Sequence, residues 1–199
     1  MQKTDARVFS MSSLTVTTPR YAIFWIYMLI SGIMLRSCAP PAAYAVGMQE
    51  RQQHIEALFD APCVAYQIPK ELALAIARQE SGYHPWILNI AGRDVRPVSK
   101  DDAVRRARDA IHAGLSCDIG LMQINSYWLR KYGWTPEQVI EPNNNVRIGL
   151  WILAQEIQRH GFNWRAVASY HTPLHRNPQR GRAYAQAIVG HVKNIQRNQ

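Results

Sequence analysis

Hydrophobic positions in the region after residue 46 recur every three to four residues, which is the period of an α-helix. The longest such pattern runs between Pro142 and Gly161 and predicts a helix that ends at the glycine. The apolar stripe of this helix consists of Val146, Leu150, Leu153 and Ile157. We expect it to be the central buried helix.

Glycine, proline and asparagine residues divide the rest of this region into shorter helical patterns. The expected helices cover residues 50–58, 69–80, 99–114 and 163–170, a short helix starts at Thr135, and a last helix carries Tyr184, Ile188, Val192 and Ile195. Between residues 85 and 97, β-forming residues flank a turn-like segment at 91–94, which predicts a small hairpin or ordered loop. The fold class is therefore mainly α (α+β), in a single domain.

The first 45 residues follow a different pattern, which is typical of a signal peptide. Arg20 precedes an apolar run over residues 21–35, and the small-x-small triplet at 43–45 predicts cleavage after Ala45. A spanning helix needs about 20 apolar residues, and this run is shorter, so no stable membrane span is expected after processing. Lipidation at Cys38 is disfavoured because Arg36 lies where a small residue is expected.

The charge balance favours a polyanionic partner. The 199 residues include 23 basic and 14 acidic ones, and removing residues 1–45 takes away four basic residues and one acidic residue, which leaves a net charge of +6. A positive surface suits nucleic acid, an anionic membrane or the bacterial cell wall. Export argues against intracellular nucleic acid, and a basic protein without a specific polyanion stays open as an alternative.

Cysteines and histidines give little indication of a metal or cofactor. Cys63 and Cys117 remain after the leader is removed, and an even pair in an exported chain permits a disulfide, with two buried free thiols as the alternative. His171 and His175 cannot share a helical face because Pro173 breaks the turn between them. We expect neither a metal site nor a cofactor.

One carboxylate is placed where it could do chemistry. Leu72, Ile76 and Glu80 are spaced four apart on the predicted second helix, so Glu80 continues a core-facing stripe. Burial disfavours an ionised carboxylate, and such a group tends to keep its proton, as a general acid must. The alternative is that Glu80 lies at a frayed helix end and faces water or pairs with Arg78.

Four segments occur in an order and spacing that resemble the successive motifs of the lytic transglycosylase domain, a goose-lysozyme-like catalytic domain. The segments are residues 77–82 (Ala-Arg-Gln-Glu-Ser-Gly), residues 118–125 (Asp-Ile-Gly-Leu-Met-Gln-Ile-Asn), Asn145 with Gly149, and residues 168–170 (Ala-Ser-Tyr). The resemblance covers about residues 55–195 and implies a lysozyme-like domain over residues 46–199. The insertion at residues 101–114 resembles versions that accompany conjugation and type IV secretion machines.

The resemblance implies a periplasmic enzyme whose substrate is the peptidoglycan glycan strand. Components of a conjugation or secretion machine are expected as further partners, and nucleic acid is not. By the resemblance, Glu80 protonates the glycosidic oxygen between N-acetylmuramic acid and N-acetylglucosamine. It then acts as base while the muramyl C6 hydroxyl closes on C1, giving a 1,6-anhydro product. The substrate supplies its own nucleophile, so one carboxylate suffices where most glycosidases need two.

The resemblance also implies residues that bind the substrate. Met122 and Gln123 are expected to line the sugar groove, with core filling as the alternative for Met122. Ser81 is expected to bond the polar substrate, unless it bonds the helix end instead. Tyr170 would lie near Glu80, and His171 stands where the family usually has asparagine, so what that asparagine holds in place is in doubt.

Two other functions remain open from the sequence. A hydrolytic muramidase of the same fold would need a second acid to position water, and Asp94 and Asp118 are the candidates. A non-catalytic wall-binding component of a secretion machine would keep the fold without turnover, although an intact Glu80 argues against it.

Overall fold

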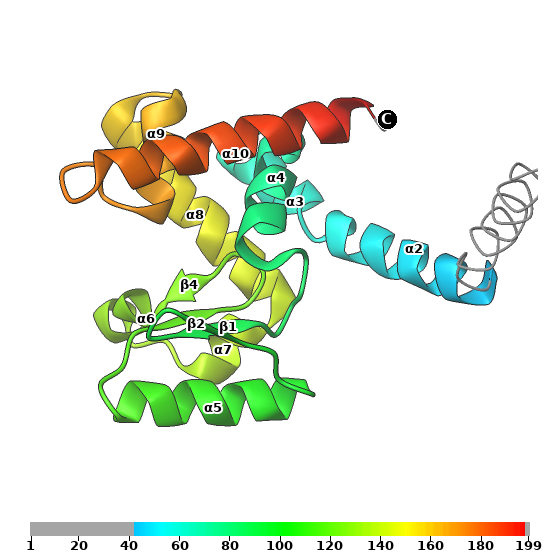
Figure 1. Ribbon diagram of the computed structural model, residues 1–199, viewed down its shortest axis with the longest axis vertical. Coiled ribbons are helices and arrows are strands. Elements are labelled where there is room, and N and C mark those ends of the chain that lie inside the picture. Colours follow the sequence, from blue (N-terminus) through cyan, green and yellow to red (C-terminus); the bar gives the residue numbers. More distant parts are fainter. Residues whose placement is uncertain (1–41, 198–199) are drawn as a thin grey trace, which may run out of the picture. The chain divides into compact units, whose positions relative to one another are not determined.

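The computed structural model describes residues 42–197, and its contacts divide the chain into two units, Met1–Val46 and Gly47–Gln199. The expected signal peptide, residues 1–45, lies almost wholly outside the described residues and stays a prediction. The helices and strands of the second unit are labelled in Figure 1. None of the described helices is long and apolar enough to cross a membrane.

The second unit is mainly helical with one small sheet, which confirms the expected fold class (Figure 1). The helices are α2 (Ala42–Ala57, which begins in the first unit), α3 (Asp60–Tyr66), α4 (Lys70–Ser81), α5 (Lys100–His112), α6 (Ser126–Tyr132), α7 (Pro136–Ile140), α8 (Pro142–His160), α9 (Trp164–His171) and α10 (Pro178–Arg197). The strands are β1 (Leu88–Ile90), β2 (Arg93–Val95), β3 (Cys117–Ile119) and β4 (Ile124–Asn125).

The sheet is antiparallel throughout, with the strand order β2-β1-β3-β4. The predicted hairpin is formed by β1 and β2, and its two turn residues Ala91 and Gly92 both have positive φ, 50° and 84°. Two consecutive positive φ values match the twist of a tight hairpin. The pairing of β3 with β1 and β4 was not predicted, because strands of two or three residues leave too short an alternation to recognise.

Helix ends follow local signals in the sequence. Gly82 caps the end of α4 with φ 57°, and the side chain of Ser99 accepts a hydrogen bond from the Asp102 backbone at the start of α5. Thr135 and Gln138 form a reciprocal capping box at the start of α7. These ends fix where each helix begins and stops, and for α4 the stop places Glu80 in the last turn.

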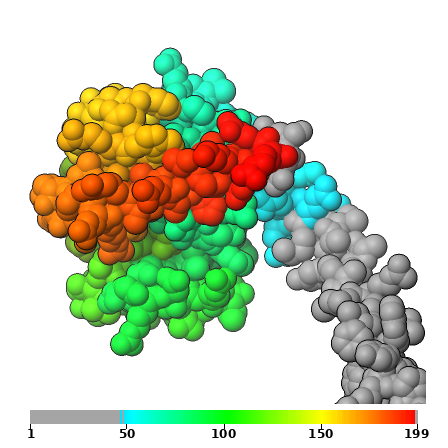
Figure 2. Space-filling view, turned by 45° about the horizontal axis from the view of Figure 1, so that its top comes forward, coloured from blue at the N-terminus to red at the C-terminus, as the bar shows by residue number. Residues whose placement is uncertain are grey.

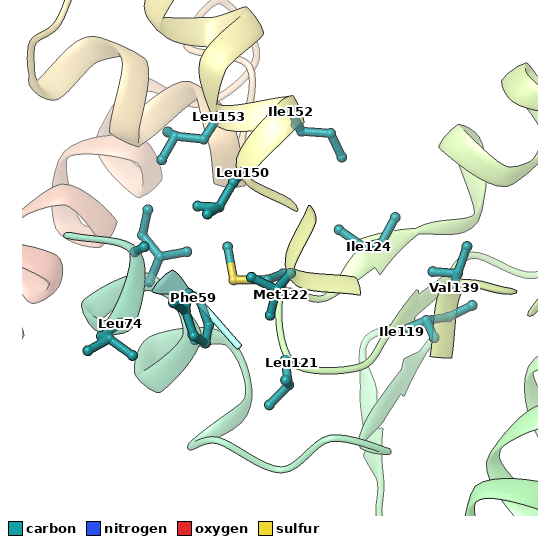
Figure 3. Close-up of a cluster of buried hydrophobic side chains, with 14 of the residues drawn as sticks. Phe59, Leu74, Ile119, Leu121, Met122, Ile124, Val139, Leu150, Ile152 and Leu153 are labelled. Atoms are coloured by element: carbon teal, nitrogen blue, oxygen red, sulfur yellow. The ribbon is translucent and has the colours of Figure 1, made fainter. Parts of the chain in front are cut away.

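The core lies around α8, as the apolar stripe predicted. Val146, Leu150 and Leu153 are fully buried, and α8 packs against α3, α7 and α9. Figure 3 shows Leu150 close to Phe59 and Met122, which come from the α2–α3 connection and the segment after β3. Beside this core, α10 packs on both α4 and α9 and crosses one face of the unit in Figure 2.

The expected disulfide is not formed. Cys63 in α3 and Cys117 in β3 are both buried free thiols in this structure. The structure therefore has two buried free thiols, the alternative to a disulfide, and both side chains serve as small apolar core residues.

Candidate active site

Glu80 lies in the last turn of α4, on the face that the spacing predicted. Leu72 and Ile76 on that face are buried, and the Glu80 side chain retains only 12% exposure. The carboxylate therefore continues an apolar stripe into the interior rather than facing water as a solvated helix end would. The residues that surround the Glu80 carboxylate belong to other helices, α9 and α10.

Tyr184 of α10 is the hydrogen-bond partner of this carboxylate. Its hydroxyl donates to Glu80 Oε1 over 2.7 Å, and the tyrosine itself is 6% exposed. Burial, followed by the negative charge of Glu80, raises the pKa of Tyr184 well above its ordinary value. The Tyr184 hydroxyl therefore keeps its proton and donates a hydrogen bond to one oxygen of the Glu80 carboxylate.

His171, at the end of α9, completes the shell around that oxygen. Its ring stacks on Tyr184 with centroids 4.5 Å apart and planes 3° apart, and its Nδ1 lies 3.7 Å from Glu80 Oε1. Arg180 Nε donates to His171 Nε2 over 3.1 Å. Because Nε2 accepts this hydrogen bond, Nδ1 is the ring nitrogen that can donate, and it faces Glu80.

Tyr170 also lies beside the carboxylate, but its hydroxyl is used elsewhere. It donates to the backbone carbonyl oxygen of Met122 over 2.8 Å. Burial raises the pKa of Tyr170 well above its ordinary value, and the negative charges of Glu80 and Asp118 raise it further. Tyr170 therefore links α9 to the segment between β3 and β4.

Asp118 on β3 is a second carboxylate within electrostatic range of Glu80. Burial raises the pKa of Asp118, the charge of Glu80 adds to this effect, and a 2.6 Å hydrogen bond from Asn125 opposes it. The strand register aligns Asp118 with Asn89 on β1, and Asn89 in turn with Asp94 on β2. This polar row crosses the sheet from Asp118 on β3 to Asp94 on the exposed hairpin.

The other acid candidate, Asp94, is exposed and engaged locally. Its carboxylate accepts a 2.7 Å hydrogen bond from Asn89, its partner across the hairpin. Asp118, by contrast, is close enough to Glu80 for the two charges to interact. Of the two acids that the sequence offered, Asp118 is the one whose pKa is raised further by the charge of Glu80.

A buried asparagine fixes the segment after β3. The Asn145 side chain donates to the carbonyl oxygens of Ile119 and Val139, both over 2.8 Å, and accepts from the Met122 backbone N–H over 2.7 Å. Gly120 lies so close that a Cβ there would meet Asn145 Nδ2 at 2.6 Å, and Gly120 also needs φ 78°. Gly120 and Asn145, which belong to two different sequence motifs, therefore hold the segment after β3 in place together.

Met122 does not present its side chain to a ligand. The side chain is fully buried (Figure 3) and packs so tightly that a Cβ on Gly149 would lie 2.5 Å from Met122 Cβ. Core filling, the alternative for this residue, therefore describes the side chain. The part of Met122 that faces Tyr170 is the backbone carbonyl.

Gln123 and Ser81 differ in what they leave free. Gln123 has φ 47°, and its side-chain nitrogen donates to the carbonyl oxygens of Ile87 and Gly120, which leaves its side-chain oxygen as an acceptor. The Ser81 hydroxyl donates to the Ala77 carbonyl over 2.9 Å and accepts from the Tyr83 N–H over 3.1 Å. The Ser81 hydroxyl therefore bonds the end of its own helix, which is the alternative to substrate binding that the sequence left open.

Sequence reasoning missed Tyr184 as a site residue and assigned it to the apolar stripe of the last helix. A buried tyrosine usually has a hydrogen-bond partner, and that was the available signal. Nothing in the sequence indicated that the partner would be Glu80. Within residues 42–197, no group of three or more His, Cys, Asp or Glu side chains could hold a metal ion.

A family model and several known proteins match parts of this chain. The family model described as the transglycosylase SLT domain matches residues 57–188. The chain is similar to the type IV secretion system protein VirB1 of Brucella abortus biovar 1 (strain 9-941), with 40% identity over 95 residues, which are 47% of this chain and 38% of that protein.

Two further relatives carry other names. The invasion protein IagB of Salmonella typhi is 34% identical over 109 residues, which are 53% of this chain and 55% of IagB. The protein IpgF of Shigella sonnei is 28% identical over 109 residues, which are 53% of this chain and 58% of IpgF. The match thus covers less than two thirds of the length of each relative. No solved structure matches the chain significantly.

Proposed function

Because the chain belongs to the transglycosylase SLT domain family, we propose that it is a peptidoglycan lytic transglycosylase. It cleaves the β-1,4 bond between N-acetylmuramic acid and N-acetylglucosamine and leaves a 1,6-anhydro end. The observation that supports this most is the nearly buried Glu80 carboxylate with its hydrogen bond from Tyr184. One acid in such a setting is what a reaction with an internal nucleophile needs.

The two oxygens of Glu80 have different surroundings, which assigns them different roles. Oε1 accepts from Tyr184 and faces His171, whereas Oε2 has no hydrogen-bond partner among the described residues. Oε2 is therefore the oxygen that carries the transferable proton. Tyr184 and His171 fix the orientation of the carboxyl group, which helps because a general acid must lie within hydrogen-bond reach of the leaving oxygen.

The reaction then proceeds with two proton transfers, one from Glu80 and one back to it. Glu80 gives its proton to the glycosidic oxygen while the bond from that oxygen to the muramyl C1 breaks. The muramyl C6 oxygen forms a new bond to C1, and its proton passes to the carboxylate, which regenerates the acid. The N-acetyl group of the substrate stabilises the positive charge that develops at C1. No water is consumed, and the glycan is cleaved without a second catalytic carboxylate.

We assign substrate contacts to the residues around Glu80. The free side-chain oxygen of Gln123 accepts from an N-acetyl N–H or a hydroxyl group of the sugar. Tyr170 and the Met122 backbone form the wall that joins α9 to this segment. Ser81 supports the end of α4 beside Glu80 through the hydrogen bonds that its hydroxyl makes with the Ala77 carbonyl and the Tyr83 N–H.

The cellular role follows from the names of the relatives and from the predicted leader. The chain is similar to a type IV secretion system protein, to an invasion protein and to the protein IpgF. We therefore place the enzyme in the periplasm, where it opens the wall locally for a secretion or conjugation apparatus. The predicted signal peptide and the basic charge of residues 46–199 support export toward an anionic cell wall.

A hydrolytic muramidase is the second candidate, and Asp118 is the observation that favours it. A hydrolase needs a second carboxylate to position water, and Asp118 is a partly buried acid within electrostatic range of Glu80. Mass analysis of the products decides between the two functions. Anhydro ends identify a transglycosylase, and reducing ends identify a hydrolase.

The central experiment is digestion of purified sacculi by the wild-type chain and by Glu80→Gln. We expect the wild type to release soluble muropeptides with 1,6-anhydro ends and the variant to release none, while its circular dichroism spectrum stays native. Glu71→Gln is the matched control, because it makes the same change in the first turn of the same helix. Equal clearing by Glu80→Gln and wild type would remove Glu80 from the mechanism. A wild type and a variant that are both folded and both inactive would support the non-catalytic wall-binding role.

A further inference from the structure

A second pocket lies apart from the Glu80 site, among α3, the α6–α7 connection, α7 and the first half of α8. Its volume is about 380 Å³, and its lining includes Tyr66, Trp134, Gln138, Asn144, Arg147 and Trp151. Pockets of roughly 300–1,000 Å³ are typical of small-ligand sites. It shares no lining residue with the Glu80 site, and the residues it takes from α8 occupy a different face from Asn145 and Gly149.

Two tryptophans form a flat-walled corner of this pocket. The rings of Trp134 and Trp151 meet at 77° with their centroids 6.2 Å apart. Tyr132 stacks on Trp134 with ring centroids 5.0 Å apart and is not among the residues that line the pocket. Both tryptophans are only half-buried. An indole face left open in a concave site suits the flat, C–H-rich face of a pyranose ring.

Polar groups with free bonding capacity surround this corner. Asn144 uses its side-chain nitrogen on the Gln138 carbonyl, and Gln138 uses its side-chain oxygen on the Thr135 N–H. Within residues 42–197, the Asn144 side-chain oxygen and the Gln138 side-chain nitrogen have no partner, so the pocket offers one acceptor and one donor. An N-acyl group presents the complementary N–H and carbonyl.

Arg147 adds a positive charge at the same place. Four of the arginines between residues 42 and 197 form ion pairs with carboxylates, and Arg147 is not among them. It is exposed, one turn from Asn144 and one turn from Trp151 on the same face of α8. An unpaired guanidinium beside such a corner binds a carboxylate through two parallel hydrogen bonds.

We propose that this pocket is a second binding site for the glycan strand, which takes an N-acylated amino sugar that carries a carboxylate-bearing peptide. The sugar ring lies against Trp134 and Trp151, its N-acyl group bonds Asn144 and Gln138, and the peptide carboxylate pairs with Arg147. The ligand class rests on the proposed function, because peptidoglycan is the polymer that carries such units. The site holds the strand without cleaving it, since it contains no carboxylate among its lining residues.

The test is a titration of the full chain carrying Glu80→Gln, so that turnover does not disturb binding. The probe is muramyl dipeptide, and the readout is the indole N–H signals in a nitrogen–proton NMR spectrum, assigned by single Trp→Phe variants. We expect the signals of Trp134 and Trp151 to shift in a saturable way. The signal of Trp164, which lies on another part of the surface, should stay in place.

A variant and a second probe separate this site from the Glu80 site. Arg147→Ala is exposed and should fold normally, and it should weaken binding of muramyl dipeptide roughly tenfold, the size of one charge-assisted hydrogen bond. Arg51→Ala, also exposed, should change nothing. N-acetylglucosamine lacks the carboxylate, so its weaker binding should not depend on Arg147.

Two results would overturn the proposal: unmoved Trp134 and Trp151 signals at millimolar muramyl dipeptide, or superimposable titrations of Arg147→Ala and its parent. Either result leaves the catalytic proposal intact, because digestion of sacculi by the wild-type chain tests that separately. Conversely, saturable shifts in a chain that never releases anhydro products would keep the binding site and refute the lytic activity.

Discussion

The hydrogen bond from Tyr184 to Glu80 makes a measurable prediction about the pH dependence of activity. Tyr184→Phe removes one hydroxyl and retains the aromatic ring that stacks on His171 at 4.5 Å. A hydrogen bond to an ionised group is worth about 1.5–3 kcal/mol, and one between neutral groups about 0.5–1.5 kcal/mol. Losing the donor therefore disfavours the ionised carboxylate by about 1 kcal/mol relative to the acid form.

This difference converts directly into a shift of the pH–rate profile. Because 1.36 kcal/mol corresponds to one pH unit, the alkaline limb, where the acid form is lost, should move upward by roughly 0.7 unit. The free energy of unfolding at neutral pH should fall by about 1–3 kcal/mol. The assay is the initial rate of muropeptide release from sacculi at a series of pH values, together with denaturant unfolding.

Other tyrosines provide the controls for this prediction. Tyr127→Phe, at a side chain that is 53% exposed, should leave both the rate and the profile unchanged. Tyr170→Phe loses a bond to the Met122 carbonyl and should lower the rate without moving the alkaline limb. The prediction is refuted if Tyr184→Phe leaves the limb in place, or if it costs as much stability in a Glu80→Gln background as in the wild type.

Three further predictions concern packing, charge and thiol reactivity. Gly149→Ala should lower the free energy of unfolding by about 1–3 kcal/mol, because the new Cβ would lie 2.5 Å from the buried Met122 side chain. A Cβ at Gly190 would meet no atom within 4 Å, so Gly190→Ala should raise the free energy of unfolding by up to about 1 kcal/mol through helix propensity. Denaturant unfolding of both variants checks this pair. Burial raises the pKa of Asp118, so ionisation of this carboxyl costs stability at pH values above 3.8, its ordinary pKa. Asp118→Asn should therefore raise the melting temperature at pH 7, and the gain should disappear as the pH falls below 3.8. A gain that persists in acid would contradict this prediction. Burial raises the pKa of Cys63 to about 11 and that of Cys117 to about 12, so neither should react with iodoacetamide in the native protein near pH 8, while both should react after unfolding, as counted by mass.

Elements with strong local signals could be predicted from the sequence, and short ones could not. The α4 and α8 boundaries follow from Gly82, Pro142 and Gly161, and the apolar stripe of α8 identified the buried helix. By contrast, α3 and α6 have seven residues each, and β3 and β4 have three and two. Such elements are stabilised by contacts with distant segments, so their own residues carry little periodicity.

The same distinction applies to the site. The placement of Glu80 on a buried face could be predicted because its spacing from Ile76 is local. The partnership with Tyr184 could not, since a tyrosine on an apolar stripe reads as core until its hydroxyl has a partner. The side chain of Met122 was expected at the groove because its neighbours resemble a sugar-binding motif, but Gly149 leaves room for it only in the core.

The 104 positions that separate Glu80 from Tyr184 have a consequence for when the protein becomes competent. The tyrosine belongs to α10, Pro178–Arg197, so a chain still being synthesised carries the acid long before it carries the donor that orients it. The proposed cleavage therefore requires that α10 has first docked on α4. A polypeptide that stops before α10 keeps the proposed acid without the hydroxyl that orients it.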